Sequence, residues 1–100
     1  MTLDELIEEL EKRNPLEIVK NGFGKGMSGR TSYDEAAFVP VEETTFGEML
    51  AHAKDLLGTV QTGYKGGEFI MHGFVNPHIA DYGSCGEPIT SYHFKYWDIA

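Results

Sequence analysis

Cysteine, basic side chains and long apolar runs are all scarce in this 100-residue chain, and each scarcity excludes a class of protein. Cys85 is the only cysteine, which excludes an intrachain disulfide and a cysteine-based zinc cluster and suits a reducing compartment. Only 8 Lys and Arg stand against 16 Asp and Glu, so the formal net charge is −8 and nucleic acid is not an expected partner. No apolar run approaches the ~20 residues needed to cross a membrane, and the acidic N-terminal segment is unlike a signal peptide.

The residues that are present favour one small folded unit. Hydrophobic residues make up 41% of the chain and aromatic residues 12%, which is enough for a single modest core. We therefore expect one domain over residues 1–100. A domain of this size buries well under ~70% of the surface of its unfolded chain, so association into a homo-oligomer would add useful burial.

Two segments carry helix signals. Thr2 and Glu5 are spaced as a capping box, and the apolar residues that follow recur at helical spacing, which predicts a helix over residues 2–13 that ends at Asn14-Pro15. Residues 15–20 are expected to add a further helical turn. Thr45 and Glu48 form a second capping-box pair before an apolar stripe, which predicts a main helix over residues 45–57. Gly58 follows at the place of a left-handed C-cap.

Several runs have the composition of strands. We expect a short or edge strand at residues 36–41, because Pro40 cannot donate to a sheet ladder. Residues 59–64 and 68–75 flank the turn Lys65-Gly66-Gly67 and predict a hairpin. Residues 76–88 are expected to form a polar loop, and the aromatic run of residues 89–97 a further strand. The pattern predicts an α+β fold, with a small antiparallel sheet of three or four strands, the main helix and an N-terminal helix.

The stretch GFGKGMSGR, residues 22–30, is expected to form a loop and combines four glycines with two cations in an acidic chain. Glycines allow backbone N–H groups to approach a ligand, and arginine binds phosphate or carboxylate groups with two hydrogen bonds. Together with the GYKGGE turn it predicts an anion site, formed within one subunit or across an interface. The candidate ligand-binding residues are Ser28, Arg30, Tyr33, Lys65, Gly66, Gly67 and Glu68. The alternative is two ordinary surface turns, with Arg30 paired to Asp34 or Glu35.

Other reactive side chains form no recognisable motif. His72, His78 and Asp81 could be drawn as metal ligands, but their spacing matches no known site, and no metal or cofactor is expected. No signature of a catalytic cysteine surrounds Cys85, and Glu68 on a hairpin is more typical of a solvated residue than of a general base. We therefore predict no catalytic residue.

Three blocks of the sequence stand out together: S-x-R-x-x-Y-x-x-x-A-F-x-P over residues 28–40, GYKGGEF over residues 63–69, and A-x-Y-G over residues 80–83. Their order and spacing resemble a family of small uncharacterised proteins of tailed bacteriophages. The resemblance covers about residues 21–90. It implies a phage accessory protein that works in the cytoplasm of a host bacterium, and it brings no established activity with it.

Three functions remain open at this point. The first is binding and sequestration of a small anionic, nucleotide-type ligand, which would counteract defence signalling in the host. The second is an acidic interaction module that inhibits a host enzyme. The third is an enzyme that modifies a nucleotide, with Glu68 or His72 as its base.

Overall fold

The computed structural model describes residues 1–28, 35–62, 68–81 and 84–99. In chain order the elements are α1 (Leu3–Glu11), β1 (Ile18–Ser28), β2 (Glu35–Thr45), α2 (Phe46–Leu56), β3 (Val60–Thr62), β4 (Glu68–Ile70), β5 (Asn76–Asp81), β6 (Ser84–Pro88) and α3 (Ser91–Ile99). Four strands form one sheet in the order β1-β2-β5-β6, and β3 pairs with β4 in a separate two-stranded sheet. The predicted α+β fold is confirmed. Within the described ranges, no helix combines the length and apolar character that crossing a bilayer requires.

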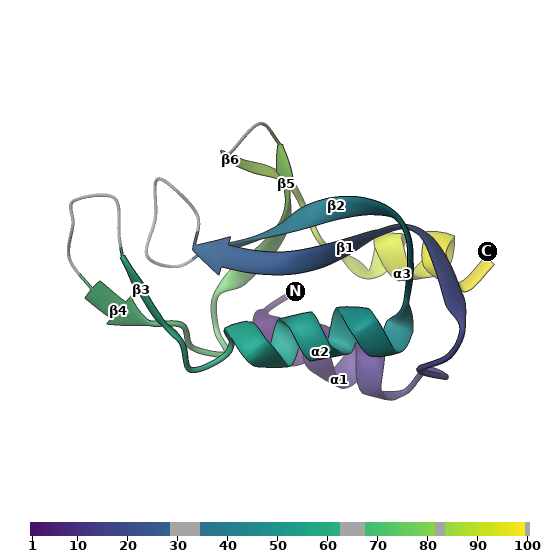
Figure 1. Ribbon diagram of the computed structural model, residues 1–100, viewed down its shortest axis with the longest axis horizontal. Helices are drawn as coiled ribbons and strands as arrows, with labels where there is room; N and C mark the ends of the chain where they lie inside the picture. The colour runs from purple at the N-terminus through teal and green to yellow at the C-terminus, as the bar shows by residue number, and fades with distance from the viewer. Residues whose placement is uncertain (29–34, 63–67, 82–83, 100) are drawn as a thin grey trace.

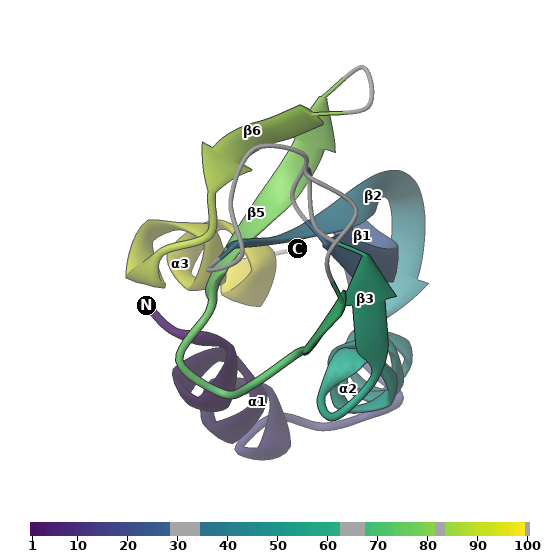
Figure 2. The same ribbon diagram turned by 90° about the vertical axis from the view of Figure 1, so that its left-hand side faces the viewer.

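The three helices pack around the four-stranded sheet. Helices α1 and α2 lie side by side beneath the long β1–β2 hairpin, and α3 lies at the end of the molecule where β1 begins (Figure 1). Figure 2 shows α3 above α1 and below β5 and β6. Buried side chains of all three helices and of β1 and β2 form one hydrophobic cluster. Phe23 is at its centre, with its ring centroid 4.4 Å from that of Phe38 and 6.0 Å from that of Trp97.

The N-terminal helix forms as its sequence predicts. The N–H of Thr2 donates to Glu5 Oε1 at 2.9 Å and the N–H of Glu5 donates to Thr2 Oγ1 at 3.3 Å, which completes the capping box. All four apolar positions of its stripe are buried: Leu3, Leu6, Ile7 and Leu10.

The main helix also begins where predicted, but only half of its capping box forms. Thr45 Oγ1 accepts a hydrogen bond from the N–H of Glu48 at 3.1 Å. The Glu48 carboxylate instead accepts from Thr44 Oγ1 at 2.8 Å. After the helix, Gly58 has φ +84°, the left-handed conformation that the sequence indicated.

The glycine-rich stretch is a strand where the sequence predicted a loop. Residues 22–28 belong to β1, as do residues 18–20, for which a helical turn was expected. β1 pairs antiparallel with β2 from Ile18↔Thr45 to Ser28↔Ala36. The glycines permit close packing, since a Cβ on Gly26 would lie 2.7 Å from Phe38 Cε1. Pairing and packing thus override the weak strand propensity of glycine.

The expectation of a short or edge strand around Pro40 was also wrong. β2 has 11 residues and lies between β1 and β5. The parallel register with β5 runs from Glu35↔Asn76 to Phe38↔Ile79, so Pro40 lies beyond the stretch that is paired on both sides. This location tolerates the missing N–H of proline. The parallel pair makes the sheet mixed, where an antiparallel sheet was predicted.

The C-terminal third differs most from the prediction. The expected loop of residues 76–88 contains β5 and β6, which pair antiparallel from His78↔Pro88 to Asp81↔Ser84. The expected strand of residues 89–97 is the helix α3, because Phe94 and Trp97, three positions apart, are both buried. The hairpin of β3 and β4 is placed correctly, but each strand has only 3 residues and neither joins the main sheet.

Candidate functional site

Most of the predicted anion site lies outside the described residues. Arg30, Tyr33, Lys65, Gly66 and Gly67 all fall in the two gaps of the description, and so do Asp34 and the turn that was expected to present Lys65. Whether these side chains meet therefore stays a prediction.

The two described members of that site are strand ends. Ser28 is the last residue of β1, and Glu68 is the first residue of β4, exposed and paired with Thr62. The strands β1 and β3, which lead into the two gaps, contact each other at the same end of the molecule (Figure 1). A cavity of about 320 Å³ lies near this end and is lined in part by Lys25 and His52.

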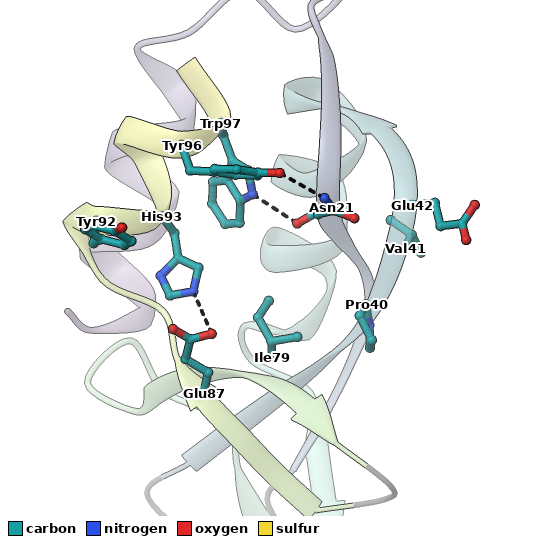
Figure 3. A pocket seen from close by; sticks show the side chains of 11 residues that line it. Asn21, Pro40, Val41, Glu42, Ile79, Glu87, Tyr92, His93, Tyr96 and Trp97 are labelled. Carbon is teal, nitrogen blue, oxygen red and sulfur yellow. Dashed lines mark hydrogen bonds and ion pairs between the residues drawn. The ribbon is translucent and has the colours of Figure 1, made fainter. Parts of the chain in front are cut away.

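A larger cavity lies at the opposite end, between α3 and the sheet. Its volume is about 520 Å³, and its described lining residues come from β1, β2, β5, β6 and α3 (Figure 3). We call it the α3 groove and define it by the residues Asn21, Gly22, Pro40, Val41, Glu42, Ile79, Glu87, Tyr92, His93, Tyr96 and Trp97.

Helix α3 supplies the aromatic wall of the groove. Tyr92 and Tyr96 are one helical turn apart, with 74% and 52% of their surface exposed. Trp97 lies behind them, and its surface is only 1% exposed. Most large rings in a domain of this size are buried, so two exposed tyrosines beside a cavity indicate a surface for contact with a ligand.

Asn21 of β1 fixes this aromatic wall against the sheet. Its carbonyl oxygen accepts a hydrogen bond from Trp97 Nε1 at 3.1 Å, and its Nδ2 donates to the Tyr96 hydroxyl at 3.0 Å (Figure 3). Asn21 has φ +54°, and among the described residues other than glycine it alone has a positive φ. Asparagine is one of the few side chains that tolerate this region, and strained backbone of this kind is enriched at functional sites.

His93 and Glu87 form the polar side of the groove. His93 Nδ1 accepts the N–H of Thr90 at 3.1 Å, so in the neutral ring the proton is on Nε2. That atom is 3.6 Å from Glu87 Oε2 on β6 (Figure 3). Thr90 and His93 also close the first turn of α3, because the N–H of His93 donates to the Thr90 carbonyl at 3.1 Å. His93 thus takes the place of the usual glutamate of a capping box, while Thr90 Oγ1 accepts from the N–H of Tyr92 at 3.3 Å, and this spacing identifies the helix start.

The groove is acidic. Glu42 and Glu87 are both exposed at its rim, and its described lining includes no lysine or arginine. It also includes no serine, threonine or cysteine that could act as a nucleophile. Across the described residues, no group of three or more His, Cys, Asp and Glu side chains could hold a metal ion.

An ion pair on the far side of α3 holds the helix in position. Arg13, which follows α1, donates from Nε and Nη2 to the two carboxylate oxygens of Asp98 at 2.8 and 2.9 Å. Its guanidinium also lies 4.3 Å from the ring centroid of Phe94. Hydrogen bonds from Arg13 lower the pKa of the Asp98 carboxyl, and the same bonds raise the pKa of Arg13.

No protein-family model matches this chain. No curated protein and no solved structure matches it either. Its function must therefore be argued from the site itself.

Sequence reasoning missed the α3 groove because it placed residues 89–97 in a strand. In a strand, Tyr92 and Tyr96 share a face with Phe94, so the run looks uniformly aromatic. In the helix, the tyrosines separate from the buried Phe94 and Trp97. The spacing of Thr90 and His93 was the signal that could have revealed it.

Proposed function

We propose that this protein is a non-catalytic interaction module, and that a segment of a partner protein binds in the α3 groove. The observation that carries the proposal is the pair of exposed tyrosines, Tyr92 and Tyr96, beside a cavity of about 520 Å³. Tyrosine is enriched at protein interfaces because it offers a large, rigid ring together with a hydroxyl group. The groove is open enough at the surface to receive side chains from an extended chain.

The anchoring of the groove supports a preformed binding site. Asn21 ties α3 to β1, while Arg13 ties its other side to α1 through Asp98. A wall held from both sides loses little conformational entropy when a partner binds, which favours affinity. For a phage protein in a host cytoplasm, a host enzyme would be a natural partner for such an acidic module.

The test is a selection of short random displayed peptides on the immobilised protein. The affinities of the selected peptides are then measured for the parent and for two variants. Val41→Tyr adds a ring inside the groove. Val60→Tyr is the control, because it adds the same ring on β3, where Val60 is 62% exposed. We expect selected peptides to bind the parent and Val60→Tyr equally and to lose at least tenfold in affinity on Val41→Tyr, roughly 1.4 kcal/mol. Trp97, the only tryptophan, reports binding by its fluorescence. Equal binding to all three proteins would refute a binding role for the groove.

A second candidate function is sequestration of an anionic, nucleotide-type ligand at the predicted loop site. It is favoured by the contact between β1 and β3, which lead into the two loops, and by the nearby cavity with Lys25 and His52. ATP, NAD and a cyclic dinucleotide serve as probes in calorimetric titrations of Arg30→Ala and Lys65→Ala. Each variant is expected to bind one of these probes about ten- to a hundredfold more weakly than the parent, because charge-assisted hydrogen bonds are lost. Lys12→Ala on α1 controls for net charge, and unaltered binding by both loop variants would exclude this site.

A further inference from the structure

The lining of the α3 groove combines aromatic rings with negative charge. Tyr92 and Tyr96 are exposed on one side, and Glu42 and Glu87 are exposed at the rim. Figure 3 places Glu87 below His93, and it shows Glu42 on β2 with its carboxylate pointing away from the groove. A cation that enters the groove would therefore meet ring faces and the Glu87 carboxylate, while Glu42 adds negative charge at the outer rim.

Two basic side chains on or against elements that flank the groove are paired elsewhere. Lys20, on β1, forms an ion pair with Glu43, and Arg13, behind α3, pairs with Asp98 and Glu9. Neither lines the groove. Among the described lining residues, only His93 faces Glu87, so no lysine or arginine of the groove neutralises Glu42 or Glu87, in a chain whose formal net charge is −8.

Among cations, the guanidinium group matches this lining best. Its plane stacks on aromatic rings, and its N–H groups form paired hydrogen bonds with carboxylates. The protein uses the same chemistry itself behind α3, where Arg13 lies over Phe94 and forms two hydrogen bonds with Asp98. The groove offers a similar combination of tyrosine rings and carboxylates, without an arginine of its own among its described residues.

We propose that the α3 groove binds an arginine side chain presented by a basic segment of the partner protein. This inference rests on the proposed function and specifies its ligand. The guanidinium lies against Tyr92 and Tyr96 and is neutralised by Glu87, while Glu42 attracts it from the outer rim. His93, whose Nε2 faces Glu87, keeps that carboxylate at the polar side of the groove.

The experiment compares two peptides of the same shape. One is the acetylated and amidated pentapeptide Ala-Ala-Arg-Ala-Ala, and the other carries citrulline, the neutral isostere, in place of arginine. Amide NMR titrations measure the weak dissociation constants expected for such short probes and locate the contact. We expect shifts at Glu87, Tyr92 and Tyr96, and about tenfold tighter binding of the arginine peptide, the combined effect of cation–π contact with the tyrosine rings and one screened ion pair.

Charge variants then identify the source of the preference. Glu87→Gln should reduce the preference for arginine about two- to fivefold, since an exposed ion pair contributes little. Glu42→Gln, which removes a charge only from the outer rim, should reduce it less. Glu8→Gln, on the exposed face of α1, changes the net charge equally and should leave the preference intact. The preference should also weaken as salt is raised. Thermal melting confirms that each variant is folded.

The outcomes separate this inference from the proposed function. Equal binding of the two peptides, or an arginine preference that survives in Glu42→Gln and Glu87→Gln, would overturn the inference. If peptides selected from the random library lose affinity on Val41→Tyr but carry no arginine, the groove is a binding site and the arginine assignment is wrong. If no selected peptide depends on the groove, the proposed function itself fails. Tighter binding of tetramethylammonium than of the arginine peptide would assign the groove to a small cation instead.

Discussion

Replacing Arg13 by alanine is expected to lower the free energy of unfolding by about 2–3 kcal/mol and to loosen α3. Three contacts contribute to this estimate. The paired hydrogen bonds with Asp98 contribute about 0.5–1 kcal/mol, because that carboxylate is 45% exposed and solvent screens the pair. The hydrogen bond from Nη1 to the Glu9 carbonyl, at 2.6 Å, contributes about 1 kcal/mol. Packing of the guanidinium on Phe94 contributes a further ~0.5–1 kcal/mol.

Urea unfolding followed by Trp97 fluorescence measures this loss. Arg13→Lys keeps the positive charge but not the planar guanidinium group. It should therefore lower the free energy of unfolding by about half as much as Arg13→Ala. A double-mutant cycle with Asp98→Asn should give a coupling energy of about 0.5–1 kcal/mol. A loss below ~0.5 kcal/mol for Arg13→Ala, the size of an ordinary surface substitution, would refute the reasoning. So would a coupling energy of zero.

The pH dependence of the same pair follows from the direction of its pKa shift. Hydrogen bonds from Arg13 favour the ionised form of Asp98, so its pKa in the folded state lies below the ordinary value of 3.8. The stabilisation is therefore fully present above that ordinary value and is lost as the pH falls through the folded-state pKa. The parent should exceed Asp98→Asn in stability at pH 7, and the difference should shrink in acid. A difference that grows in acid would contradict this account.

Three further predictions concern packing, backbone conformation and assembly. Gly26→Ala should destabilise the protein by about 1–3 kcal/mol in urea unfolding, because the new Cβ would lie 2.7 Å from Phe38 Cε1. Gly24→Ala should destabilise the protein clearly less, because the nearest atom to its new Cβ is 3.3 Å away. Asn21→Ala should be less stable than Asn21→Gly by about 1 kcal/mol, since alanine disfavours a positive φ, and the reverse order would refute the strain argument. We expect sedimentation at micromolar concentration to show a species larger than the 11.1 kDa monomer, and a pure monomer would exclude the proposed homo-oligomer.

The exposed apolar side chains indicate where such self-association would occur. Val60 and Ile70, paired across β3 and β4, are 62% and 63% exposed, and Phe74 is 77% exposed. The aromatic C-terminal run gives little support for assembly, because Phe94 and Trp97 are buried within their own chain. Val60→Glu should shift a sedimenting oligomer towards monomer if the β3–β4 surface forms the contact.

The sequence by itself determined the elements whose signals are local. The cap at Thr2, the N-cap at Thr45 and the left-handed Gly58 depend on neighbouring residues, so they could be identified without a fold. The pairing of β3 with β4 was located for the same reason. The α+β class followed from the order of these elements, and the residues proposed for anion binding were also chosen from local chemistry.

Only the tertiary structure decided the rest, because the remaining elements depend on partners distant in the sequence. The glycine-rich β1 is a strand because β2 pairs with it and Phe38 packs closely over Gly26. β5 forms because its backbone pairs with β2 on one side and β6 on the other, a pairing that its polar sequence does not encode. The aromatic run became a helix because the core accepts Phe94 and Trp97 on one face of it. The α3 groove exists only after these choices, since it joins residues from five elements that no local pattern brings together.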